Sequence, residues 1–106
     1  MLTAEVKGFD NYIIYSDGTI FSKKRKRFLE GGFDTDGYRQ LVLCQNGKRA
    51  TKKFHRLVAE HFLDNPDNLP VVNHKDGCKE NNDVSNLEWC TISHNTKEAY
   101  RLKFLS

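Results

Sequence analysis

The chain has 106 residues, of which 38% are hydrophobic and 29% charged, with a formal net charge of +3. These values fit one domain and exclude collagen-like, proline-rich and wholly disordered chains. No apolar stretch approaches the roughly 20 residues that cross a bilayer, and residues 1–7 lack a signal-peptide core. We therefore expect a soluble, cytoplasmic protein without a membrane partner.

The first half of the chain has the pattern of short strands. Residues 12–15 and 19–22 flank Ser16-Asp17-Gly18, a tight-turn signal, and residues 38–44 lead through Asn46-Gly47 into residues 49–54. Alternating apolar residues separated by such dipeptides are typical of hairpins. This spacing predicts an antiparallel sheet of three to five short strands.

Helical periodicity follows the strands. The apolar face at spacings of three and four residues consists of Phe54, Leu57, Val58, His61 and Phe62. This pattern predicts a helix that ends at Asp64-Asn65-Pro66, because proline disfavours helix in the residue before it. His61, on the apolar face, is predicted to be packed.

The last third of the chain is polar but keeps apolar anchors. Residues 67–90 are rich in Asn, Asp and Gly, yet include Val71-Val72, Val84 and the segment 87–90. A long loop that keeps apolar anchors is more often functional than disordered, so we expect two short strands around a structured loop. Ser93 is a good N-cap for a last helix over residues 94–104.

The three cysteines are Cys44, Cys78 and Cys90. They form no Cys-x-x-Cys pair, which argues against a structural zinc site. Free and largely buried thiols in a reducing compartment are the expected state.

The positive charge gathers before the last third. Residues 1–62 carry twelve Lys/Arg against seven Asp/Glu, whereas residues 63–106 carry five against seven. This excess suits a polyanion, because each phosphate contact releases counterions; a solvated hairpin tip or a nuclear-localisation-like run would also produce it. The candidate DNA-binding residues are Lys23, Lys24, Arg25, Lys26, Arg27, Lys48, Arg49, Lys52, Lys53 and Arg56.

The segments 71–77, 85–89 and 93–96 place His74, Asn86 and Asn95 in the order strand, loop, helix. This arrangement resembles the HNH, or ββα-metal, endonuclease family, in its phage and intron-encoded homing branch. The resemblance extends upstream to residues 55–59 and Pro66, and more weakly to residues 12–20. It implies an α+β fold with an N-terminal small antiparallel β-sheet plus a helix, followed by a C-terminal ββα-metal motif.

The resemblance also implies roles for individual residues. His74 would be the general base, Asn73 and Asn95 the ligands of Mg²⁺ or Mn²⁺, and Asn86 the catalytic-site residue that braces the loop. Asn73 departs from relatives that have aspartate there, and Asn95 from the frequent histidine. A neutral amide holds Mg²⁺ less tightly than a carboxylate, so we expect a weak metal site in the free enzyme.

Neighbouring residues have alternative interpretations. Asp76, before Gly77, is predicted to be a turn residue rather than a metal ligand. His55 could contact DNA or assist the site, but a structural histidine is favoured. Trp89 is expected in the core and His94 exposed.

The resulting hypothesis is a metal-dependent endonuclease acting on double-stranded DNA. Residues 1–53 would form a basic DNA-binding β region, and residues 54–106 the helix and the nuclease unit of one compact domain. One such site cuts one strand, so a monomer or weak homodimer should nick, in the host cytoplasm if the gene is a phage gene. The alternatives are a DNA-binding protein of this fold with weak or no catalysis, and a structural RNA-binding protein.

Overall fold

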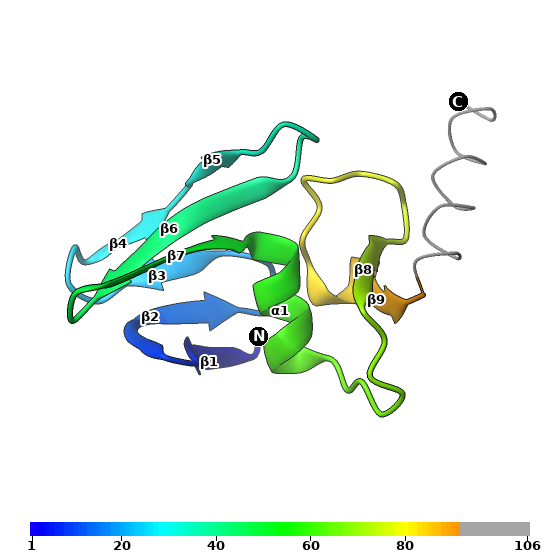
Figure 1. Cartoon of the computed structure of the whole chain (residues 1–106), viewed down its shortest axis with the longest axis horizontal. Coiled ribbons are helices and arrows are strands. Elements are labelled where there is room, and N and C mark those ends of the chain that lie inside the picture. The colour runs from blue at the N-terminus through cyan, green and yellow to red at the C-terminus, as the bar shows by residue number, and fades with distance from the viewer. Residues whose placement is uncertain (92–106) are drawn as a thin grey trace.

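The computed structural model describes residues 1–91, and its elements are drawn in Figure 1. The predicted last helix, with Ser93, His94 and Asn95, lies outside the described residues. The described elements are β1 (Thr3–Val6), β2 (Phe9–Tyr15), β3 (Ile20–Ser22), β4 (Arg27–Leu29), β5 (Gly32–Phe33), β6 (Arg39–Gln45), β7 (Lys48–Lys53), α1 (Phe54–Phe62), β8 (Val71–His74), the 3₁₀ turn η1 (Val84–Asn86) and β9 (Leu87–Cys90).

The predicted N-terminal sheet is in fact two antiparallel sheets. The first has the order β1-β2-β3-β4, and the second has the order β5-β6-β7. The hairpin at Asn46-Gly47 joins β6 to β7 as predicted, with Gln45 opposite Lys48. The expectation of a single sheet was wrong. The sequence pattern predicts which consecutive strands pair as hairpins, but it does not predict that these hairpins belong to two separate sheets.

Three strands were missed by the pattern, namely β1, β4 and β5. The strand β4 lies at the end of the basic run, and its Arg27, Phe28 and Leu29 pair with β3. The apolar pattern of this strand was not recognised, because it follows four basic residues and only its last two residues are apolar. The basic residues 23–26 consequently form the turn between β3 and β4.

Helix α1 joins the N-terminal sheets to the rest of the chain. It begins at Phe54 and buries Phe54, Leu57 and Val58, which belong to one core cluster with Leu43 of β6 and Leu87 of β9. Figure 1 shows α1 between the N-terminal strands and the hairpin of β8 and β9. Within residues 1–91, no helix is long and apolar enough to span a membrane.

The periodicity of α1 was predicted correctly, but its last turn is more polar than expected. His61 is only half-buried, and its Nδ1 donates to the carbonyl of Leu57 while its Nε2 accepts from the backbone N–H of Lys7. It therefore ties α1 to the turn between β1 and β2 through a hydrogen bond rather than by packing alone.

The cysteines are not in disulfides, but they are less buried than expected. Cys44 and Cys78 are exposed and Cys90 is buried. Cys44 lies next to the buried Leu43 on β6, so strand alternation turns its side chain to the outer face. Cys78 lies in the loop that follows β8.

Candidate active site

The two strands expected in the last third are present as the hairpin β8–β9. Val71 pairs with Cys90, Asn73 with Glu88 and His74 with Leu87. A two-stranded hairpin alone is marginal in water, and here α1 packs against both strands and against η1. The hairpin therefore holds Asn73 and His74 on a supported strand.

Asn73 and His74 are consecutive and both buried, with 9% and 5% of their surfaces exposed. Successive side chains of a strand point to opposite faces, and the two residues have different partners. Asn73 donates from Nδ2 to Glu88 Oε1 at 3.0 Å, whereas His74 Nε2 lies 2.7 Å from Asn82 Oδ1. The strand can therefore give them different roles.

The bond to Asn82 fixes the protonation pattern of the His74 imidazole. An amide oxygen only accepts hydrogen bonds, so Nε2 carries the hydrogen and Nδ1 keeps its lone pair. Within residues 1–91, Nδ1 makes no hydrogen bond. Burial lowers the pKa of His74, against the opposing effect of the Asn82 hydrogen bond. The ring is thus a neutral imidazole with an available base nitrogen.

Two further rings enclose His74. The centroid of Tyr38 lies 5.7 Å from that of His74, and the centroid of His55 lies 5.0 Å from it. Tyr38 and His55 are themselves 4.9 Å apart. We call these three residues the ring cluster. Tyr38 comes from the loop before β6 and His55 from the first turn of α1, so three segments distant in sequence meet at the base.

His55 is more closely connected to the site than the sequence predicted. It is 6% exposed, and its buried Nδ1 has no hydrogen-bond partner among residues 1–91. Burial, followed by the neighbouring His74, lowers the pKa of His55 to about 3. His55 is therefore neutral at physiological pH, and it packs against His74 instead of forming the hydrogen bonds of an ordinary structural histidine.

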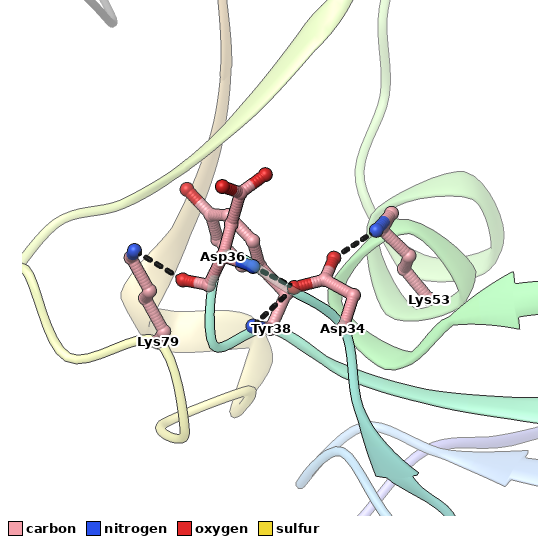
Figure 2. A network of polar contacts seen from close by, with 5 residues as sticks. All are labelled: Asp34, Asp36, Tyr38, Lys53 and Lys79. Atoms are coloured by element: carbon pink, nitrogen blue, oxygen red, sulfur yellow. Dashed lines mark hydrogen bonds and ion pairs between the residues drawn. The ribbon is translucent and has the colours of Figure 1, made fainter.

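Figure 2 shows how Tyr38 is held in place by polar contacts around it. Asp34 Oδ1 accepts from the backbone N–H groups of Asp36 and Tyr38, each at 2.9 Å, and its other oxygen pairs with Lys53. The hydrogen bond from Lys53 lowers the pKa of Asp34 to about 2. Lys79 donates to the Asp36 carbonyl, and its Nζ lies 4.8 Å from the Tyr38 ring centroid. The network links the β5–β6 loop to the loop after β8.

Asn86 closes the loop after β8. Its Oδ1 accepts from the backbone N–H of Asp76 at 3.1 Å, and its Nδ2 donates to Asp76 Oδ1 and to the Asn81 carbonyl, each at 2.9 Å. Asp76 also accepts from the backbone of Cys78 and from Asn81 Nδ2. Both oxygens of Asp76 therefore serve the turn, in keeping with its sequence interpretation.

The predicted metal ligands are only partly described. Because Asn73 donates to Glu88 through Nδ2, its Oδ1 is the atom that can bind a cation. Asn95 lies outside the described residues. In residues 1–91, no group of three or more His, Cys, Asp and Glu side chains could hold a metal. An amide oxygen beside a carboxylate is a donor set for a hard cation such as Mg²⁺, which keeps several waters, and it is unsuited to structural zinc.

The predicted DNA-binding cations occupy two places. Residues 23–26 and Lys48 lie at the hairpin ends that Figure 1 shows on the far side of α1 from β8 and β9. Arg25 and Arg27 line a groove of about 690 Å³ between β4 and β6. Lys53 and Arg56 instead line a pocket of about 240 Å³ beside His55.

Several of these cations already have partners. Lys23 pairs with Glu5, and Lys53 with Asp34. Arg56 donates to the Pro70 carbonyl at 2.9 Å, and its guanidinium lies 5.4 Å from the ring centroid of Trp89. Trp89 is half-buried against the core, as expected. Lys24, Arg25, Lys26, Arg27, Lys48 and Arg49 are exposed, and Lys52 is half-buried.

Sequence reasoning missed Asn82, Tyr38 and Glu88. Asn82 stood among several turn-forming asparagines, and Tyr38 was assigned only to a strand. Glu88 could have been found, because it stands opposite Asn73 once the register of the two strands is fixed.

Comparison with known proteins gives a consistent result. Residues 52–97 match the HNH endonuclease family model. An uncharacterized HNH endonuclease of Acanthamoeba polyphaga mimivirus is 43% identical over 86 residues, which are 81% of this chain and 26% of that protein. The DNA endonuclease I-HmuI of Bacillus phage SP01 is 37% identical over 94 residues, which are 88% of this chain and 54% of that protein.

The fold has a solved counterpart. A structure of DNA binding and cleavage by the HNH homing endonuclease I-HmuI matches with a TM-score of 0.86 and 35% identity, and the match covers 100% of this chain and 62% of that chain. The present chain thus spans about a quarter to a half of the length of these curated relatives.

Proposed function

Since the chain belongs to the HNH endonuclease family, we propose that it is a metal-dependent endonuclease that hydrolyses phosphodiester bonds of double-stranded DNA. The observation that carries this proposal is the state of His74. A buried imidazole has its hydrogen held on Nε2 by Asn82, and its Nδ1 makes no hydrogen bond within residues 1–91. Such a nitrogen can accept a proton from a water molecule.

In this mechanism His74 Nδ1 takes the proton of the attacking water. The ring cluster restricts rotation of the imidazole, because Tyr38 and His55 pack against it. Asn86 supports the same strand end from the loop, where the backbone N–H of Lys75 donates to its carbonyl at 2.7 Å. These residues keep the base oriented before substrate arrives, which lowers the cost of reaching the reactive geometry.

Asn73 Oδ1 and, by the family resemblance, Asn95 would hold Mg²⁺ or Mn²⁺. When bound, the cation neutralises charge on the phosphate and the leaving oxygen. Glu88 orients the Asn73 amide by accepting from its Nδ2. Because the Asn73 ligand is neutral, the proposed site is weak in the free protein and fills when a DNA phosphate adds its charge.

The exposed cations at the hairpin ends would contact the DNA backbone, while Lys53 and Arg56 line the pocket beside His55. One such site cuts one strand, so the proposed product is a nick made by a monomer or a weak homodimer. The homing role is also part of this proposal, because one relative is described as a homing endonuclease, YosQ of a Bacillus subtilis prophage. A cytoplasmic location is proposed as well, on the sequence pattern alone.

The test is conversion of supercoiled plasmid to the nicked circle with Mg²⁺ or Mn²⁺. We expect nicking by the wild type that is lost with a chelator and reduced about 10³-fold in His74→Ala, within the range of general-base contributions. DNA binding in a gel shift should survive in the variant.

One observation favours a second candidate, a DNA-binding protein of this fold with little catalysis. Asn73 offers no carboxylate at a position where the family resemblance implies aspartate in some relatives. Absence of nicking with every divalent cation, together with a retained gel shift, would select this candidate over the endonuclease.

A further inference from the structure

Asn82 is buried, although residues 75–81 of the same loop are exposed. It is 5% exposed, whereas its neighbours Glu80 and Asn81 are exposed. Asparagine is mostly found at the surface, and burial of a polar group costs free energy unless it is hydrogen-bonded. The bond of Asn82 Oδ1 to His74 Nε2, at 2.7 Å, meets that need.

The turn between β2 and β3 fixes the backbone of Asn82 from the N-terminal sheet. Gly18 is buried with φ of +93°, and a Cβ built on it would lie 2.7 Å from Asn82 Cβ and 2.8 Å from the Asn82 carbonyl oxygen. The carbonyl of Ser16 accepts from the backbone N–H of Val84 at 2.8 Å. The turn thus touches the loop at Asn82 and again two residues later.

The hydrogen bond of Asn82 affects which nitrogen of His74 carries the hydrogen, as well as the structure of the loop. A neutral imidazole can carry its hydrogen on either nitrogen, and the partner of one nitrogen decides which form prevails. Tyr38 and His55 pack on the ring but leave this choice open, because they contact His74 ring to ring, stacked for Tyr38 and tilted for His55. Asn82 is the residue that contacts a ring nitrogen of His74 within the described chain.

We propose that Asn82, held against the glycine turn at Gly18, is a positioning residue that keeps the hydrogen of His74 on Nε2 and so directs Nδ1 to the attacking water. This proposal rests on the proposed nuclease function. It assigns the β2–β3 turn a part in catalysis, in addition to any part that the N-terminal sheets play in DNA binding.

The test compares Asn82→Ala with Asn82→Asp in the full 106-residue chain. Alanine removes the acceptor, and we expect kcat for plasmid nicking to fall roughly 10- to 100-fold with KM for DNA unchanged. Aspartate keeps an acceptor at the same position, and we expect it to restore kcat to within about 10-fold of the wild type. Asn11→Ala, at an exposed asparagine of β2, is the matched control and should behave as the wild type.

NMR spectra of the His74 imidazole nitrogens, recorded without DNA or metal, give a readout independent of activity. We expect the Nε2–H form in the wild type and in Asn82→Asp, and a mixture of both forms in Asn82→Ala. If the wild type shows the Nε2–H form but never nicks DNA, the endonuclease function fails while the Asn82 contact stands.

Unchanged kcat and an unchanged imidazole spectrum in folded Asn82→Ala would overturn the proposal, and so would a loss confined to KM. If alanine unfolds the loop, Asn82→Leu repeats the comparison with a side chain that fills the space but lacks an acceptor. An unchanged kcat with an unchanged imidazole spectrum, or a loss confined to KM, in Asn82→Leu would then overturn the proposal.

Discussion

The N-terminal sheets and the β8–β9 hairpin are stabilised by different means. Strands β1 to β7 contribute apolar residues to the core, such as the fully buried Ile14, Ile20 and Leu43. The buried polar residues of these strands and their turns are two serines, Ser16 and Ser22. These sheets follow the ordinary rule that folding is driven by burial of apolar surface.

The hairpin and the elements packed on it bury a different set of side chains. The buried polar residues in this part are His55, Asn73, His74, Asn82 and Asn86. Such groups cost stability unless they are paired, and they gather where a protein performs chemistry. The contrast indicates that the sheets supply a support and that the hairpin uses it to hold reactive groups.

The first prediction separates stability from activity at the core. Leu43→Ala should lower the free energy of unfolding by about 3 kcal/mol, because it leaves a cavity at a fully buried position. Nicking per folded molecule should stay near the wild-type value, since Leu43 is not a member of the ring cluster. Denaturant unfolding and a plasmid assay at low temperature measure the two quantities.

Val42→Ala is the control for this variant, because Val42 is adjacent but 44% exposed on the outer face. Its unfolding free energy should change by less than about 0.5 kcal/mol. Equal losses in the two variants would mean that the N-terminal sheets are not stabilised by this core.

The second prediction concerns pH and the buried histidine of the hairpin side. The pKa of His55 falls from 6.5 to about 3 on folding, so between these values the unfolded chain binds more protons than the folded one. The contribution of neutral His55 to the free energy of unfolding is therefore fully present above pH 6.5, and it is lost as the pH falls from 6.5 towards 3. From pH 7 to pH 5 the loss from His55 should be up to about 2 kcal/mol.

Chemical unfolding at both pH values tests this, with His55→Phe as the comparison. The variant should lose less stability over the same interval, since phenylalanine does not titrate. The loss that remains comes from His74, whose pKa is also lowered by burial. Asp34, with its pKa lowered to about 2, titrates below this window. The same pH dependence in the variant and the wild type would show that His55 is not buried in the neutral form.

The third prediction tests the proposed metal ligand. Asn73→Asp places a carboxylate beside Glu88, where Asn73 now donates at 3.0 Å. Two adjacent carboxylates repel, and a divalent cation relieves that repulsion. We expect Mg²⁺ or Mn²⁺ to bind the free protein about 10-fold more tightly, as measured by calorimetry.

Without metal, Asn73→Asp should be less stable than the wild type for the same reason. Asn68→Asp adds the same charge at an exposed position and should leave the affinity unchanged. An equal affinity for all three proteins would remove Asn73 from the proposed ligand set.

The smallest expected effect distinguishes DNA-contacting cations from other surface cations of the sheets. Arg25→Ala should reduce the slope of log affinity against log salt by about 1, the loss of one phosphate contact. Lys7→Ala removes one charge at an exposed position outside the candidate set and should leave the slope unchanged. Binding titrations at several salt concentrations measure this, and equal slopes for both variants would argue against the hairpin ends as a DNA contact.

Some features could be predicted from the sequence because they depend on the spacing of residues that are close together in the chain. The apolar positions of α1 recur with the helical period, and Asn46-Gly47 provides the backbone freedom that a two-residue hairpin needs. The spacing of His74 and Asn86 likewise placed one at the end of β8 and the other in the turn before β9. Residues that act through neighbours in the chain leave a periodic or positional signal.

Other features were decided only by the tertiary structure. Nothing local distinguishes Asn82 from Asn81, yet the contact with Gly18 turns one inward and leaves the other in solvent. Tyr38 reaches His74 only because β6 and α1 pack against the same core as β8. The identity of a residue sets what its side chain can do, but which partner it meets depends on segments that are distant in sequence and are brought together by burial of their apolar faces.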